Sequence, residues 1–515
     1  MKNELQYNNS FHSKIDYEFS PFSIKPNLML SKMISAIVAI KIFFNVSRKI
    51  VKLTFQFRNI LNQRYKIFLK PIKKHIKETL QFAYPVAIGQ IGYVMMGVVD
   101  SAMVGQIGYS FLAAASLANG LFFLTLVVGI GISYAVTPLV AISIGSNSKD
   151  ECTNLFRQSF YINFITGVLL VIATYFFADM ISILNQPEEI TRLAIPYTRI
   201  LGFSLLPIMV FQSYKQFIEG MAIMRPAMII TIAANFVNLF ANWIYIYGNL
   251  GFPRLELNGA GLATFTSRTF MMIVFIFFLK KSKSFSQYNL SVLPIKFDKT
   301  LINRLLKLGI PGGLQYFFEA GAFTFAAFMI GWLSSKDLAA HQIAISIASI
   351  TYMVVLGISS SSAIRVGNAV GARNISETRK AGFTALSLAS VFMLSCAVIL
   401  ILFNKTLPLL FVNDFEVIHI SSSLLIIAAF FQLFDGVQAV ALGVLRGITD
   451  VKYPTAITFI SYWIIGLPLG YYLGFIYEFG VIGVWIGLSV GLATSASLLT
   501  IRFHNKSKEV INFSR

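Results

Sequence analysis

Long apolar segments separated by short polar connectors run through the chain from about Leu80 onward. A helix that crosses the hydrocarbon core of a bilayer needs about 20 mostly apolar residues. Glycine and proline inside such segments are compatible with spanning helices, because neighbouring helices can satisfy the freed backbone groups. The pattern predicts about twelve spans, at residues 80–104, 112–144, 155–182, 193–219, 226–250, 259–280, 306–332, 338–370, 380–403, 420–446, 453–476 and 480–502.

The two halves of this pattern repeat each other. Pro85 corresponds to Pro311, and Gly145 to Gly371, with the same spacing along the chain in both pairs. Leu112–Ala114 and Leu338–Ala340 keep this constant spacing, which we call the repeat offset. Six spans per half bring both copies into the membrane from the same side, which gives a parallel repeat. We therefore expect an all-α polytopic protein with bundles at 80–281 and 306–503, joined by a cytoplasmic linker at 282–305.

Composition and charge agree with a membrane protein. Hydrophobic residues make up 56% of the 515 residues, more than a water-soluble chain can bury. Cys152 and Cys396 offer neither a disulfide framework nor a metal-ligand spacing. Lysine and arginine gather in alternate connectors, among them Lys149, Arg225 and Arg379. The positive-inside rule places these connectors and both termini in the cytoplasm, as expected for a multi-pass protein of the cell (inner) membrane.

A basic tail occupies positions 1–79, ahead of the first predicted span. Up to Lys77, fifteen Lys and Arg stand against three acids, which supplies +12 of the formal net charge of +20. Residues 33–44 are apolar but too short to span the membrane and are interrupted by Lys41. A cytoplasmic amphipathic segment lying on anionic lipid is the preferred interpretation, and a disordered tail added by an upstream start codon is the alternative. Residues 504–515 are expected to form a cytoplasmic C-terminal tail.

Three acidic residues lie well inside predicted spans: Asp100 in the first, Glu319 in the seventh and Asp435 in the tenth. An ionisable side chain at such a place costs about 2.5 to 3.5 kcal/mol on insertion scales, so it is a functional candidate. A packing role through hydrogen bonds to a neighbouring helix is the alternative. A functional role is favoured over a packing role, because Ser, Thr or Asn would provide the same interhelical hydrogen bonds at a lower cost of insertion. Glu219 and Asp179 are expected near span ends, within reach of water.

Five segments of the predicted spans carry a joint resemblance to a known family. They are VVDSAMVG, NFVNLFANWIYIYG, YFFEAGAFT, AAHQIA and FDGVQAVALGVLRG, in the first, fifth, seventh, eighth and tenth spans. Together they resemble the multidrug and toxic compound extrusion (MATE) transporters, and the sodium-coupled branch more than the proton-coupled one. The similarity covers residues 80–503. It implies a MATE-type fold and cation-coupled drug efflux.

Carried over position by position, the resemblance implies two sets of binding residues. The carboxy-terminal bundle would hold a cation site of Glu319 and Asp435. The polar site of the amino-terminal bundle would consist of Asp100, Asn238, Asn242 and Thr264. Proton-coupled relatives tend to place an acid where Asn242 stands, so the amide favours a transient Na+ over a proton. Interhelical hydrogen bonding is the alternative role for Asn238 and Asn242.

The repeats and the acids together predict antiport by alternating access. Cations would enter from outside, the bundles would rearrange, and an organic cation would be released outward. The substrate would bind in a cleft lined by aromatic and Met side chains, with a carboxylate for its charge. We expect no enzyme activity, no structural metal, no cofactor besides Na+ or H+ as coupling ion, and a monomer in the bilayer.

Three other function classes compete with antiport. A lipid or polysaccharide-precursor flippase of a related duplicated fold would need a basic central cavity for phosphate groups, whereas Arg365 and Arg446 fall nearer the cytoplasmic ends of spans. An intramembrane enzyme would need a catalytic constellation, and no His pair, paired-aspartate motif or nucleophile elbow occurs in the sequence. Nucleic-acid binding is disfavoured, because membrane topology explains the basic charge.

Overall fold

The computed structural model describes residues 66–184, 187–285, 287, 288, 290, 292 and 297–509. The fold described below is that of the described residues from Pro71 onward, which belong to one compact unit. Within the described ranges, twelve helical segments are long and apolar enough to cross a membrane. The prediction of about twelve spans is confirmed. Positions 1–65 of the predicted basic tail, including the apolar stretch at residues 33–44, lie outside the described residues.

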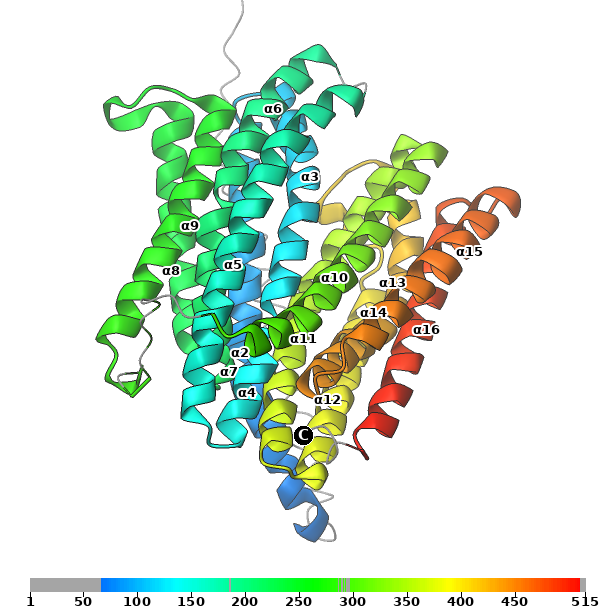
Figure 1. Cartoon of the computed structure of the whole chain (residues 1–515). Helices are drawn as coiled ribbons and strands as arrows, with labels where there is room; N and C mark the ends of the chain where they lie inside the picture. The colour runs from blue at the N-terminus through cyan, green and yellow to red at the C-terminus, as the bar shows by residue number, and fades with distance from the viewer. Residues whose placement is uncertain are drawn as a thin grey trace, which may run out of the picture. The chain divides into compact units, whose positions relative to one another are not determined.

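The helices follow the order expected from the repeat (Figure 1). The first bundle contains α2 (Lys66–Gly105), α3 (Tyr109–Ser133), α4 (Val136–Gly145), α5 (Lys149–Phe177), α6 (Glu188–Phe203), α7 (Leu205–Gly220), α8 (Arg225–Tyr247) and α9 (Glu256–Lys281). The second contains α10 (Lys299–Leu333), α11 (Ser335–Gly371), α12 (Ile375–Leu402), α13 (Phe415–Gly447), α14 (Lys452–Phe459), α15 (Leu467–Tyr471) and α16 (Gly480–Lys506). Short 3-10 turns link several of them. Helix α2 begins at Lys66, ahead of the span start predicted at Leu80.

Three of the predicted spans are interrupted near prolines. The second divides into α3 and α4 at Tyr134, and the fourth into α6 and α7 at Ser204. A π-helix at Ile460–Gly466 precedes Pro468 in the eleventh. Proline lacks an N–H and clashes with the carbonyl four residues earlier, which is Tyr134 for Pro138 and Phe203 for Pro207. The interruptions are therefore local consequences of the sequence.

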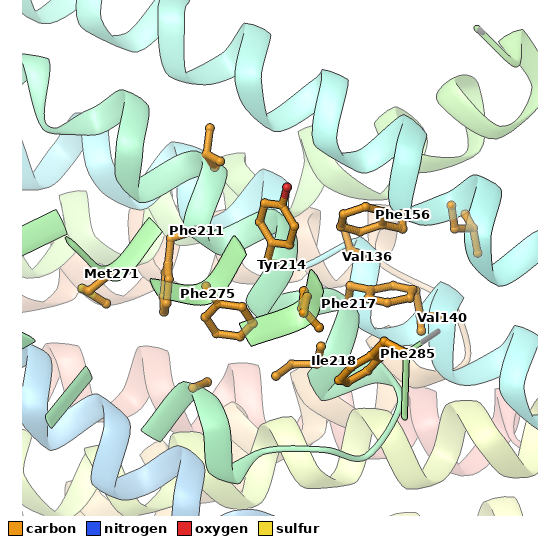
Figure 2. Close-up of a cluster of buried hydrophobic side chains, with 14 of the residues drawn as sticks. Val136, Val140, Phe156, Phe211, Tyr214, Phe217, Ile218, Met271, Phe275 and Phe285 are labelled. Atoms are coloured by element: carbon orange, nitrogen blue, oxygen red, sulfur yellow. The ribbon is translucent and has the colours of Figure 1, made fainter. Parts of the chain in front are cut away.

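Aromatic packing fills the interior of the first bundle (Figure 2). The ring centroids of Phe156 and Phe217 are 4.9 Å apart, and those of Phe211 and Phe275 are 5.2 Å apart. These rings join α5, α7 and α9. Because lipid tails are as apolar as the rings, close packing rather than exclusion of water holds the helices together. Nearly every residue of α7 is buried as a result.

The two bundles contact each other where α4 and α11 end, and we call this end of the molecule the basic face. A Cβ added to Gly145 would lie 2.2 Å from the carbonyl oxygen of Asn368, and one added to Gly371 would lie 2.1 Å from that of Ile142. Ile142 and Asn368 are separated by the repeat offset, as are Gly145 and Gly371. The repeat therefore makes the same contact twice, and each contact requires a glycine.

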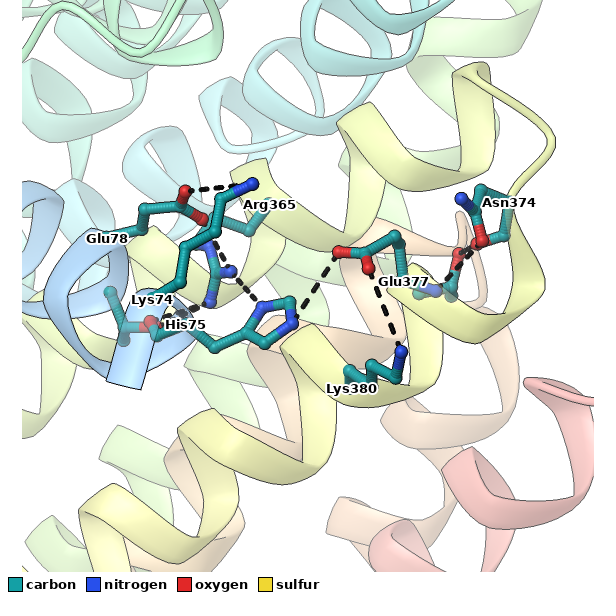
Figure 3. A network of polar contacts seen from close by, with 9 residues as sticks. Lys74, His75, Glu78, Arg365, Asn374, Glu377 and Lys380 are labelled. Atoms are coloured by element: carbon teal, nitrogen blue, oxygen red, sulfur yellow. Dashed lines mark hydrogen bonds and ion pairs between the residues drawn. The ribbon is translucent and has the colours of Figure 1, made fainter. Parts of the chain in front are cut away.

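Ionic contacts reinforce this closure between the bundles. Arg365 of α11 donates to the carboxylate of Glu78 at 2.9 Å, to the hydroxyl of Thr79 at 2.7 Å and to the carbonyl of His75 at 3.1 Å, all three on α2. Nε2 of His75 lies 3.6 Å from the carboxylate of Glu377 on α12 (Figure 3). The network joins the first bundle to the second at the basic face.

A second ionic contact lies at the related position of the repeat. Arg304 on α10 pairs with Glu151 on α5 at 2.7 Å. The repeat offset relates Arg304 to Glu78 and Glu151 to Glu377. Equivalent positions of the two copies therefore form ionic contacts between the bundles. The charges are not the same, since Arg304 stands where the other copy has Glu78.

We expect Arg365→Gln to weaken closure of the bundles at the basic face. The Glu78 side chain is 37% exposed, so solvent screens part of the interaction, and we expect a loss of about 1 kcal/mol, or a roughly fivefold shift toward separated bundles. Pulsed EPR distances between spin labels placed at Ser146 and Ala372, one on each bundle, measure that shift.

Arg379→Gln is the matched control for this experiment. Arg379 lies on α12 and bonds within its own bundle, to the carbonyl of His504 at 3.0 Å and the hydroxyl of Ser507 at 2.9 Å. Its replacement should leave the distance between the two labels unchanged. The same distance distribution in wild type and Arg365→Gln would contradict the closing role of Arg365.

Candidate functional site

The four residues predicted for the amino-terminal bundle lie together where α2, α8 and α9 meet. Asp100 accepts hydrogen bonds through both carboxylate oxygens, from Nδ2 of Asn242 at 2.6 Å and from the hydroxyl of Thr264 at 2.9 Å. Nδ2 of Asn242 also lies 3.2 Å from Oδ1 of Asn238, one turn earlier on α8. All four side chains are buried. The structure thus brings the predicted set into one polar site.

Two atoms of this polar site have no hydrogen-bond partner within the described part of the chain. They are Oδ1 of Asn242 and Nδ2 of Asn238. Leaving a buried polar group unpaired costs about 1–3 kcal/mol, so a ligand that pairs with it is favoured. The carboxylate of Asp100, the hydroxyl of Thr264 and the free oxygen of Asn242 form an oxygen-rich donor set. Hard cations prefer such oxygen ligands.

Arg268 is a neighbour of this site that the sequence analysis did not single out. It lies one turn after Thr264 on α9, donates to the hydroxyl of Ser204 at 2.7 Å and interacts electrostatically with Asp100. Its guanidinium also lies 4.9 Å from the ring centroid of Phe122. The rule applied to acids inside spans would have found Arg268 if it had been applied to bases as well.

The predicted pair in the second bundle also occupies one region. Glu319 on α10 and Asp435 on α13 are buried and close enough to interact electrostatically. The hydroxyl of Tyr352 donates to Oε1 of Glu319 at 3.2 Å. The side-chain amide of Gln432, one turn before Asp435, is buried and has no partner among the described residues. Two carboxylates in one buried site repel each other, so a cation bound between them would be stabilised.

A cavity between the two bundles, which we call the central chamber, contains further charged residues. It encloses about 460 Å³ of empty space, open in part to solvent, and is lined from both bundles. Its charged lining residues are Lys215 and Glu219 on α7, which are 3.9 Å apart, and Arg446 on α13. The expected aromatic lining and carboxylate are present, but no methionine occurs among the described lining residues.

Two sequence-based expectations change at the central chamber. Glu219 lies one residue before the end of α7, as expected, but its side chain is only 2% exposed because neighbouring helices enclose α7. Arg446 does belong to the last turn of α13, yet its guanidinium lies in the chamber wall, 5.4 Å and 5.2 Å from the ring centroids of Tyr134 and Tyr316. Asp179 is within reach of water, as expected, with 58% of its side chain exposed.

Twelve spans in two equivalent halves, buried acids inside each half and a charged chamber between them define a duplicated membrane transporter. The family model MatE matches residues 85–244 and again residues 311–472. The chain belongs to the MatE family. The family assignment, the all-α fold and the two-fold duplication predicted from the sequence are thereby confirmed.

Curated relatives and solved structures agree with this assignment. The chain is 36% identical to a probable multidrug resistance protein NorM of Rhodopseudomonas palustris, over 84% of this chain and 92% of that protein. It is 31% identical to a probable multidrug resistance protein NorM of Bacillus subtilis, over 85% and 97%. The crystal structure of the eukaryotic MATE transporter AtDTX14 superposes with a TM-score of 0.77 at 20% identity, covering 85% of this chain and 98% of that one.

Proposed function

We propose that this protein exports organic cations and related drugs by antiport, with inward sodium as the coupling ion. The observation that carries the proposal is the presence of a buried acidic site in each bundle, around Asp100 in the first and at Glu319 and Asp435 in the second. Relatives with about a third of their residues in common are named multidrug resistance proteins. Cations would bind at these acids and the drug would bind in the chamber. Inward cation flow would thereby be coupled to outward drug flow.

The orientation of the protein follows from its charges. Lys149, Arg225 and Arg379 lie in the first two turns of α5, α8 and α12, which begin at the basic face. The positive-inside rule puts this face and both termini in the cytoplasm of a cell-membrane protein. Because the bundles touch at the basic face, we assign the structure to a state that is closed toward the cytoplasm. Sodium and drug would then exchange with the outside through the opposite face, and a monomer is sufficient for this cycle.

Sodium is the preferred coupling ion because of the ligands around Asp100. An amide at Asn242 and a hydroxyl at Thr264 supply oxygen without titrating, whereas a proton carrier needs a group that gains and loses a proton. Two cation sites are physically useful. Exchange of one sodium for one monovalent drug moves no net charge, whereas a second sodium adds inward charge worth about 2.3 kcal/mol per 100 mV.

We therefore expect drug efflux to be sodium-dependent and electrogenic. Uptake of a fluorescent organic cation into inverted membrane vesicles, at fixed pH and clamped potential, should fall when a large inert cation replaces sodium. Asp100→Asn should reduce the response to membrane potential more than it reduces drug binding, because it removes one ion site and leaves the chamber intact. Full activity without sodium, together with loss of activity when the proton gradient collapses, would assign proton coupling instead.

A lipid or polysaccharide-precursor flippase is the second candidate, because Lys215 and Arg446 make the central chamber basic. A MOP superfamily transporter of Pyrococcus furiosus, described as having a binding pocket of reverse polarity, superposes with a TM-score of 0.77 at 19% identity, over 85% of this chain and 96% of that one. A flippase would not move the cationic dye in response to sodium. An intramembrane enzyme is set aside, because the relatives are named as resistance proteins and transporters.

A further inference from the structure

We propose that the central chamber binds the carboxylate of amphoteric substrates through Lys215 and Arg446, while Glu219 binds the cationic group of the same molecule. This inference rests on the proposed efflux function and narrows its substrate class. The preferred substrates would carry both a positive charge and a carboxylate. A purely cationic drug would use only part of the site.

The chamber lining carries more positive than negative side chains. Lys215 and Glu219 lie 3.9 Å apart with side chains 7% and 2% exposed, so they largely balance each other. Arg446 interacts electrostatically with Glu319, but it forms no ion pair with a carboxylate of the described residues. A buried charge without a close partner is unfavourable. The carboxylate of a bound substrate would supply the missing negative charge.

Unpaired hydrogen-bond donors in the chamber point to the same ligand chemistry. Gln216, next to Lys215 on α7, is fully buried, and its Oε1 accepts a hydrogen bond from the hydroxyl of Thr137. Nε2 of Gln216 has no hydrogen-bond partner in the described structure, and neither has Nε of Arg446. An ammonium, a guanidinium and an amide N–H₂ are all donors, and a carboxylate is a strong acceptor for each of them.

Two tyrosine rings hold the guanidinium of Arg446 in place. Tyr134 from the first bundle and Tyr316 from the second have ring centroids 5.4 Å apart, and the guanidinium lies against both and also hydrogen-bonds to Tyr316. Contacts of this kind orient an arginine while most of its five donors stay available. Because the two rings come from different bundles, the position of the guanidinium depends on how the two bundles meet.

Rhodamine B and its ethyl ester test this site, because they share one cationic ring system and differ in a single free carboxylate. Fluorescence anisotropy of each dye with the purified full-length protein in nanodiscs gives the two affinities. We expect the wild type to bind rhodamine B more tightly than the ester. Arg446→Gln should weaken rhodamine B binding about tenfold, which corresponds to about 1.4 kcal/mol, and change ester binding less than about twofold.

Glu219→Gln should shift the preference in the opposite direction. It removes the partner of the cationic group and leaves Lys215 free for the carboxylate, so ester binding should fall more than rhodamine B binding. Opposite shifts from two residues in one chamber would not arise from a general loss of structure. Arg502→Gln is the matched control, since Arg502 also lies over a tyrosine, 3.9 Å from the ring centroid of Tyr453, but pairs with Asp450 outside the chamber.

The results separate this inference from the efflux function on which it rests. Equal loss of both dyes in Arg446→Gln, or rhodamine B binding no tighter than ester binding in the wild type, would overturn the carboxylate site. Sodium-driven uptake of the ester would still support efflux in that case. Selective binding of rhodamine B without sodium-driven uptake of either dye would support the site and overturn the proposed antiport.

Discussion

Asp435→Asn and Glu319→Gln are each expected to abolish drug efflux while the protein stays folded and inserted in the membrane. Each change removes a buried carboxylate from the pair in the second bundle. Loss of a hydrogen bond or contact to a charged ligand typically costs about 1.5–3 kcal/mol, so cation affinity should fall roughly 10- to 150-fold. Insertion should if anything become easier, since a charge leaves the span.

Drug resistance of cells and sodium-driven dye uptake into vesicles, both corrected for the amount of inserted protein, measure this effect. Asp414→Asn is the matched control on the same helix. Asp414 accepts from the backbone N–H groups of Glu416 and Val417, each at 3.0 Å, and asparagine caps a helix equally well. Normal efflux by both Asp435→Asn and Glu319→Gln at normal expression would reject the proposed cation site.

Gly145→Ala and Gly371→Ala are expected to prevent full closure at the basic face and so to reduce transport strongly. The added Cβ atoms would come within 2.2 Å and 2.1 Å of carbonyl oxygens on the opposite bundle. No rotation of a side chain relieves a clash with backbone, so the bundles must move apart. Such overpacking costs about 1–3 kcal/mol, which corresponds to a shift of roughly 5- to 150-fold away from the closed state.

Spin-label distances between Ser146 and Ala372, measured beside dye transport, test the effect of these two substitutions. Gly120→Ala is the control, because a Cβ at Gly120, which also lies within a helix, would have no heavy atom within 4 Å. That change should leave transport unaffected and stabilise α3 slightly, since alanine favours helix over glycine by about 1 kcal/mol. Wild-type closure in Gly145→Ala and Gly371→Ala would contradict the requirement for glycine at this interface.

The spans, the repeat and the buried acids could be predicted from the sequence, because each depends on local or linear properties. Apolar length determines whether a segment can cross the bilayer, and the constant repeat offset reveals the duplication. The gathering of Asp100, Asn238, Asn242 and Thr264 was expected from family resemblance alone, and the structure places these residues in contact. Whether they bind sodium stays a prediction.

The sequence by itself thus determined that this protein is a duplicated membrane protein of about twelve spans with acids inside its bundles. Only the tertiary structure decided what lies between the bundles. Lys215 and Glu219 lie in the first half of the chain and Arg446 in the second. Glu219 and Arg446 also lie at span ends, where a charged residue is common and gives little indication of function. The three residues share one chamber because α7 is enclosed by its neighbours and Arg446 reaches back to two tyrosines. Likewise, the repeated glycines are visible in the sequence, but their mutual contacts depend on how two separately folded bundles meet.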